Sequence, residues 1–178
     1  MKKFSPKFID MMIGVVLGLG FQWWPALTQP WQYAAFIFSY LDIVDFWIDY
    51  EPSLKKFPPK REVDVLLDVG IIFCLFLYTY ATQLTIAYFL TAFIALRVFD
   101  FFWLLSSKRE YLPTGTDKTF VDTWLWIDTV EAGGTAALIA LTSLTSVLAP
   151  LAILVIFIVF RATMRVIASW RYKRTYFV

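Results

Sequence analysis

The sequence contains no histidine and a single cysteine, Cys74. Histidine is the commonest metal ligand and proton carrier near neutral pH, so chemistry that relies on it is excluded. One cysteine cannot form a disulfide within the chain, and a lone buried cysteine usually behaves as a small apolar residue. The patterns GxSxG, HExxH and CxxC are also missing. Acyl transfer and zinc chemistry therefore lack a nucleophile or a ligand set.

Charge is scarce as well. Only 17% of the 178 residues are charged and 60% are hydrophobic, with a net charge of +2. Soluble domains contain about 25% charged and about 45–50% apolar residues. This composition predicts an integral membrane protein with one compact domain, residues 1–178. The small net charge gives no indication of nucleic-acid binding, and no cofactor is predicted.

Three long stretches carry no Asp, Glu, Lys or Arg: 11–41, 69–96 and 132–160. A membrane-spanning helix needs about 20 apolar residues, so each stretch is too long for one upright helix and too short for two. We interpret each stretch as a hairpin that crosses the membrane, turns and returns. The turns are expected at 24–30, 81–83 and 143–146. The fold class is therefore all-α, a bundle of six transmembrane helices at about 8–24, 31–50, 63–81, 84–106, 120–143 and 149–170.

Basic residues lie only at one end of these hairpins. The predicted loops 51–62 and 107–119 and both termini contain Lys or Arg, whereas the three turns contain none. Cytoplasmic loops of membrane proteins are enriched in Lys and Arg. We therefore predict a multi-pass protein of the cell inner (plasma) membrane, bacterial or archaeal, with both termini in the cytoplasm and tryptophans at both interfaces. Lipid headgroup contacts are expected for Lys55, Lys56, Lys60, Arg61, Arg171, Lys173 and Arg174.

The three hairpins resemble one another in sequence. The pairs Ile9-Asp10, Leu67-Asp68 and Ile127-Asp128 recur at similar intervals, and runs beginning Ala-Phe-Ile end in Asp-Phe-Trp or Asp-Phe-Phe-Trp. This pattern predicts three helical-hairpin repeats. The small-residue patch 132–137 could bring helices close together, either within the bundle or between copies, and a homo-oligomer is expected.

Several charged residues fall inside the predicted helices. Ionisable groups within a membrane usually face a bundle interior or a water-filled cavity, and usually pair with one another. Acidic residues outnumber basic ones, so some acids must be protonated, be hydrated or hold a cation. The predicted ion or substrate pathway is Asp42, Asp45, Asp68, Asp100, Asp128 and Glu131, with Arg97, Arg161 and Arg165 as counter-ions.

Two functional readings follow from this cluster. The first is a protein that conducts, transports or senses a small cation or cationic solute through the Asp/Arg cluster, open to the cytoplasm. The second is a non-transporting membrane subunit whose charged inner face docks a cytoplasmic protein. The charges also have a purely structural interpretation, as ion pairs that fix helix register. In neither functional reading is the protein expected to be an enzyme.

One motif supports an enzymatic alternative. Asp42, Asp45 and Asp49 form an Asp-x2-Asp-x3-Asp pattern, which resembles the aspartate-rich motif of intramembrane prenyltransferases. Leu41 stands where that family usually has Asn, and the chain is shorter than that fold. The resemblance implies a Mg²⁺ site at these three aspartates and action on a diphosphate lipid, since Mg²⁺ favours carboxylate and phosphate oxygens.

Overall fold

A computed structural model describes residues 6–144 and 149–172 of the chain. Six α-helices and two short 3-10 helices make up these residues, and no β-strand occurs among them. The predicted all-α class and the six helices are confirmed. The elements are α1 (Pro6–Gly20), η1 (Phe21–Ala26), α2 (Pro30–Lys56), α3 (Glu62–Tyr80), η2 (Ala81–Gln83), α4 (Ile86–Tyr111), α5 (Gly115–Leu144) and α6 (Pro150–Arg171).

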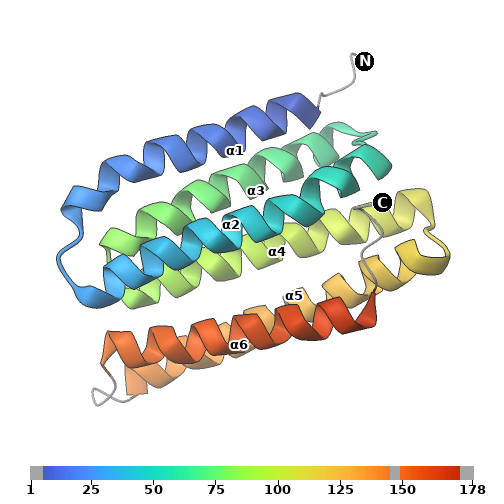
Figure 1. Ribbon diagram of the computed structural model, residues 1–178. Coiled ribbons are helices and arrows are strands. Elements are labelled where there is room, and N and C mark those ends of the chain that lie inside the picture. Colours follow the sequence, from blue (N-terminus) through green and yellow to red (C-terminus); the bar gives the residue numbers. More distant parts are fainter. Residues whose placement is uncertain (1–5, 145–148, 173–178) are drawn as a thin grey trace.

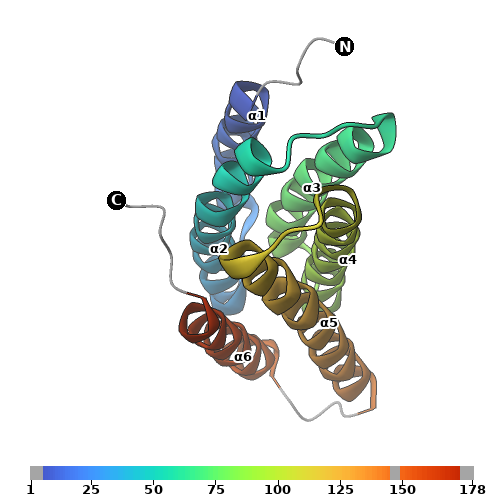
Figure 2. The same ribbon diagram turned by 90° about the vertical axis from the view of Figure 1, so that its right-hand side faces the viewer.

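The helices run up and down along one common direction (Figure 1). The α1–α2 and α3–α4 turns lie at one end of the bundle, and the short links 57–61 and 112–114 lie at the other, beside the start of α1 and the end of α6. Viewed from the end, α2, α3, α4, α5 and α6 enclose a common interior, while α1 packs on α2 and α3 (Figure 2). We call the end with the links 57–61 and 112–114 the charged end.

Local sequence signals explain where α2 begins. Pro30 occupies its first turn, where proline loses no helical hydrogen bond. The Gln32 side-chain oxygen accepts hydrogen bonds from the backbone N–H of Thr28 at 2.8 Å and of Gln29 at 3.0 Å. These bonds satisfy backbone donors that an unprotected helix start would leave open. The predicted turn at 24–30 therefore has a defined structure.

Four helical segments are long and apolar enough to cross a membrane: Lys7–Ala26, Glu62–Gln83, Ile86–Tyr111 and Pro150–Arg171. Their outward-facing side chains are apolar, as shown by Phe73 at 59% exposure and Val159 at 60%. Soluble monomers rarely expose such surfaces. These four segments support a multi-pass membrane protein.

The remaining helices, α2 and α5, are the longest of the six, with 27 and 30 residues. Length therefore does not keep them from crossing a membrane; their acidic residues lower their hydropathy. The acids in the middle of both helices are turned toward the bundle interior, as described below. On the outside of α2, Leu41 is 65% exposed and Val44 is 42% exposed. In its middle, α2 thus has an apolar outer face and an acidic inner face.

The predicted helix boundaries are wrong at the charged end. The loops predicted at 51–62 and 107–119 shrink to 57–61 and 112–114, because α2, α4 and α5 extend by several residues. Pro52 is accommodated inside α2. The extra turns are amphipathic and pair across helices: Lys56 Nζ lies 2.5 Å from Asp117 Oδ1, and Lys108 Nζ lies 2.6 Å from Asp122 Oδ1. These contacts join different helices, so rules that consider only neighbouring residues in the sequence do not predict them. The turn predicted at 143–146 lies partly outside the described residues.

Candidate functional site

The interior of the bundle contains three arginines surrounded by six carboxylates. Arg97 comes from α4, and Arg161 and Arg165 lie one turn apart on α6. The acids lie at helical spacings that place them on one face of each helix. We call this set the carboxylate–arginine network: Asp42, Asp45, Asp49, Asp100, Asp128, Glu131, Arg97, Arg161 and Arg165.

Arg161 connects three helices. Its Nε donates to Asp42 Oδ1 at 2.9 Å, and its Nη1 donates to Glu131 Oε1 at 3.1 Å. Its Nη2 lies 3.6 Å from Asp45 Oδ2. The Arg161 side chain is only 3% exposed. A buried guanidinium with several acidic partners is the arrangement expected for an intramembrane arginine.

Arg165 lies one turn nearer to the charged end. Its Nε is 2.7 Å from Asp45 Oδ2 and also donates to Asp45 Oδ1 at 2.9 Å, while its Nη1 donates to Asp49 Oδ2 at 2.7 Å. Asp42, Asp45 and Asp49 therefore do share one face of α2, as their spacing predicts. That face is turned toward the two arginines of α6.

Tyr172, just beyond α6, closes this side of the network. Its hydroxyl donates to Asp49 Oδ2 at 3.1 Å and accepts from Trp124 Nε1 at 2.9 Å. Burial, with a further contribution from the Asp49 charge, raises the pKa of the Tyr172 phenol well above its ordinary value. The phenol therefore stays protonated and remains a donor to Asp49. The sequence analysis did not identify Tyr172.

Arg97 is the most deeply buried arginine, at 1% exposure. Its Nη1 donates to Asp128 Oδ1 at 3.3 Å and lies 3.6 Å from Asp100 Oδ2, while its Nε lies 3.5 Å from Glu131 Oε2. Its guanidinium carbon is 4.9 Å from the centre of the Phe93 ring. Within the described part of the chain, Arg97 Nη2 and Asp128 Oδ2 have no hydrogen-bond partner. The network is thus bonded more loosely around Arg97 than around Arg161.

The charges of the network do not balance. Six carboxylates face three guanidiniums, so three carboxylates are in excess (six minus three). Asp45, at 33% side-chain exposure, is the most exposed acid; the other five side chains are at most 9% exposed. An uncompensated buried carboxylate is expensive, so it takes up a proton, a cation or water.

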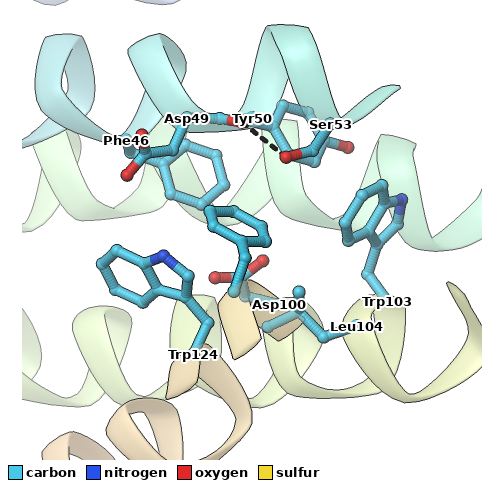
Figure 3. A pocket seen from close by; sticks show the side chains of 9 residues that line it. Phe46, Asp49, Tyr50, Ser53, Asp100, Trp103, Leu104 and Trp124 are labelled. Carbon is cyan, nitrogen blue, oxygen red and sulfur yellow. Dashed lines mark hydrogen bonds between the residues drawn. The ribbon is translucent and has the colours of Figure 1, made fainter. Parts of the chain in front are cut away.

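A cavity adjoins the network on the side of the charged end (Figure 3). Asp49 of α2 and Asp100 of α4 both line it, with Trp124 and Trp103 to either side of Asp100. The accessible volume of this cavity is about 30 Å³, roughly twice the volume that one water molecule needs. The cavity is lined by Phe46, Asp49, Tyr50, Ser53, Asp100, Trp103, Leu104, Phe120 and Trp124.

Aromatic side chains fill the bundle on the other side of the network. Tyr78, Phe89, Phe93 and Phe157 are each 0% exposed. The ring centres of Tyr78 and Phe89 are 4.8 Å apart, as are those of Phe93 and Phe157. We call these four residues the aromatic layer. It separates the network from the end of the bundle that carries the α1–α2 and α3–α4 turns.

Asp68 lies apart from the arginines, although it was predicted to share their pathway. It is fully buried and accepts a hydrogen bond from the Tyr50 hydroxyl at 2.6 Å. Tyr50 also lines the cavity, so Asp68 adjoins the cavity wall through that side chain. Helical spacing places Asp68 and Asp64, four residues apart, on one face of α3 but does not show which neighbour Asp68 meets.

Two of the tryptophans expected near the inner membrane interface, Trp103 and Trp124, are buried inside the bundle. Trp103 and Trp124 are 3% and 6% exposed and form cavity walls. A signal was present: Trp103 follows Asp100 by three residues, and Trp124 precedes Asp128 by four, which puts each pair on one helix face.

The basic residues predicted to touch lipid headgroups gather at the charged end. Lys56 and Arg61 pair with acids there, and Lys60 lies over the Tyr111 ring at 3.8 Å. Lys55 pairs with Glu51, and Arg171 lies 4.3 Å from the centre of the Trp126 ring. Their contact with lipid stays a prediction. Lys173 and Arg174 lie outside the described residues.

Comparisons with protein-family models, curated proteins and solved structures found no match. Among residues 6–144 and 149–172, no group of three Asp, Glu, Cys or His is arranged to hold a metal ion. Asp42, Asp45 and Asp49 instead have oxygens engaged by Arg161 and Arg165. What the site does must follow from its own chemistry.

Proposed function

We propose that this protein crosses the membrane six times and transports a small cation or protons, which enter the carboxylate–arginine network from the charged end. The observation that carries the proposal is the excess of three carboxylates over guanidiniums in a buried network. Ionised carboxylates without compensation are costly in a membrane, and a cation or proton that enters the network would supply the missing positive charge.

The proposed orientation rests on the distribution of basic residues. The charged end carries Lys56, Arg61 and Lys108, whereas the α1–α2 and α3–α4 turns contain no charged residue. Under the positive-inside rule the charged end faces the cytoplasm. The acids of α2 and α5 then lie within the membrane but face the interior, where arginines compensate part of their charge.

The aromatic layer favours a carrier over an open pore. Tyr78, Phe89, Phe93 and Phe157 are fully buried and in mutual contact beyond the network. An ion can leave toward the opposite side only if these rings part. Transport therefore requires a conformational change after the cation has bound.

Transport is tested with the full chain in sealed liposomes. The movement of H⁺, Na⁺, K⁺ and NH₄⁺ is followed with ion-sensitive dyes under imposed gradients, for the natural protein, Asp128→Asn and Asp122→Asn. Asn retains an acceptor for Arg97 but removes one of the excess charges. Asp122 is the matched control, because it lies on the same helix but pairs with Lys108 and Lys118 at the surface.

We expect flux by the natural protein and by Asp122→Asn, and at least tenfold slower flux by Asp128→Asn with the same elution from a sizing column. Absence of flux for every ion, under gradients of concentration and voltage, would overturn the transport proposal and leave the non-transporting subunit as the better reading. Equal flux by Asp128→Asn would remove the network from the pathway.

A further inference from the structure

We propose that the cavity between α2, α4 and α5 is a binding site for a small ammonium cation, either ammonium itself or a methylated ammonium. The inference rests on the proposed function, because it names the class of cation that the network receives. It is carried by the lining of the cavity, which combines aromatic side chains with two carboxylates.

The walls of the cavity are mainly aromatic. Cations are attracted to the faces of aromatic rings, most strongly to tryptophan, and desolvated sites built from several rings recognise alkylated ammonium groups. Each of the ring-bearing residues is at most 8% exposed, so a bound cation would be shielded from water. The aromatic lining residues are Phe46, Tyr50, Trp103, Phe120 and Trp124.

Asp100 is the natural counter-ion. Within the described residues its basic partner is Arg97, whose Nη1 lies 3.6 Å from Asp100 Oδ2, a distance too long for a strong hydrogen bond. The Asp100 side chain retains 8% exposure and lines the cavity. An ammonium N–H group there could donate to this carboxylate while its carbon atoms or remaining hydrogens lie against the rings.

Asp49 and Ser53 supply further polar contacts on the α2 side. Asp49 Oδ2 already accepts hydrogen bonds from Arg165 and Tyr172, which hold the carboxylate in place at the cavity wall. The Ser53 hydroxyl donates to the Asp49 backbone oxygen at 2.6 Å, so its own oxygen remains able to accept. Acceptors therefore approach the cavity from both α2 and α4 (Figure 3).

The size and composition of the cavity favour ammonium over other cations. A hard metal ion requires a shell of oxygen ligands, whereas most of this lining is carbon. The accessible volume of the cavity is only about 30 Å³, which suits a cation comparable with one or two water molecules. A bulky cation such as tetraethylammonium would require the walls to move apart.

Binding is tested on the purified full chain in detergent by titrating methylammonium chloride, with tryptophan fluorescence and calorimetry as readouts. Sodium chloride at equal ionic strength and tetraethylammonium chloride are the comparison salts. The variants are Asp100→Asn, Trp103→Leu, and two controls away from the cavity, Asp122→Asn and Trp170→Leu; Trp170 is 83% exposed.

We expect saturable binding of methylammonium but not of sodium or tetraethylammonium, about tenfold weaker binding for each cavity variant, and unchanged binding for both controls. Two cavity variants are used so that misfolding of one leaves the other decisive. Equal binding of sodium, or natural affinity in folded Asp100→Asn, would overturn the inference.

The two proposals fail separately. Flux of H⁺ or K⁺ without methylammonium binding would refute the ammonium site and leave transport standing. Methylammonium binding at Asp100 without flux of any ion would refute transport and retain the site.

Discussion

Arg161 on α6 and Asp42 on α2 are joined across 119 positions of the chain by a hydrogen bond of 2.9 Å from Nε to Oδ1. Asp42 is 6% exposed and Arg161 is 3% exposed. Helices α2 and α6 are the first and last of the five that enclose the bundle interior. This buried ion pair therefore closes the ring of helices.

Removing Arg161 should destabilise the fold strongly. Arg161→Leu leaves Asp42 and Glu131 buried without their guanidinium, and loss of one partner of a buried pair costs about 3–5 kcal/mol. We expect a lower midpoint in SDS-induced unfolding of the detergent-solubilised protein, partly restored in the double variant Arg161→Leu/Asp42→Leu. Arg171→Leu, at the edge of α6, serves as the control. A midpoint for Arg161→Leu equal to that of Arg171→Leu would show that this ion pair contributes nothing to stability.

Neighbouring glycines of α5 should respond differently to alanine. A Cβ atom on Gly134 would lie 2.6 Å from Cζ of Phe160, whereas one on Gly133 would have no atom within 4 Å. We expect Gly134→Ala to destabilise the α5–α6 contact by about 1–3 kcal/mol, because overpacking forces side chains to shift. Gly133→Ala should be neutral or slightly stabilising, since alanine is the better helix former. The same unfolding titration measures both, and equal midpoints would contradict the packing of α6 on Gly134.

Tyr172 should make stability depend on pH in the alkaline range. An unfolded tyrosine ionises near pH 10, and burial raises the Tyr172 pKa in the folded protein. Above about pH 10 the unfolded chain loses a proton that the folded protein retains, so stability falls as pH rises toward the folded pKa. Melting temperatures from about pH 9 to 12 should therefore decline more steeply for the natural protein than for Tyr172→Phe. Parallel declines would mean that Tyr172 ionises equally easily in both states.

Topology can be tested with single cysteines. Natural Cys74 is 2% exposed and should not react with a membrane-impermeant maleimide. Thr28, in the α1–α2 link, and Arg109, in the last turn of α4, are both exposed. In oriented membrane vesicles we expect Thr28→Cys and Arg109→Cys to be labelled from opposite sides. Labelling of both from one side would exclude the six-span arrangement and, with it, the proposed direction of cation entry.

Much of the candidate site was predictable from local spacing. Asp42, Asp45 and Asp49 recur at helical intervals, as do Arg161 and Arg165, and both sets prove to share a helix face. Periodicity of this kind is a property of one helix alone. Residues at such spacing therefore share a helix face whichever helices pack around them.

The choice of partners was not predictable in the same way. Spacing assigned Asp68 to the same pathway as Asp128, yet Asp68 meets Tyr50 and Asp128 meets Arg97. Nor did the sequence show that Trp103 and Trp124, which were expected near the inner membrane interface, line a cavity inside the bundle. The rotation of each helix about its axis decides these contacts, and that rotation depends on packing against other helices.

By itself, the sequence determined that the chain is helical, that long uncharged stretches alternate with charged ends, and that acids outnumber arginines inside the helices. These are consequences of composition and of the 3.6-residue period, which act along the chain. Only the tertiary structure decided that α2 and α6 meet through Arg161, that α4 and α5 extend into the charged end, and that Asp100 lies in an aromatic cavity. Such contacts join residues far apart in sequence, and the packing of whole helices selects them.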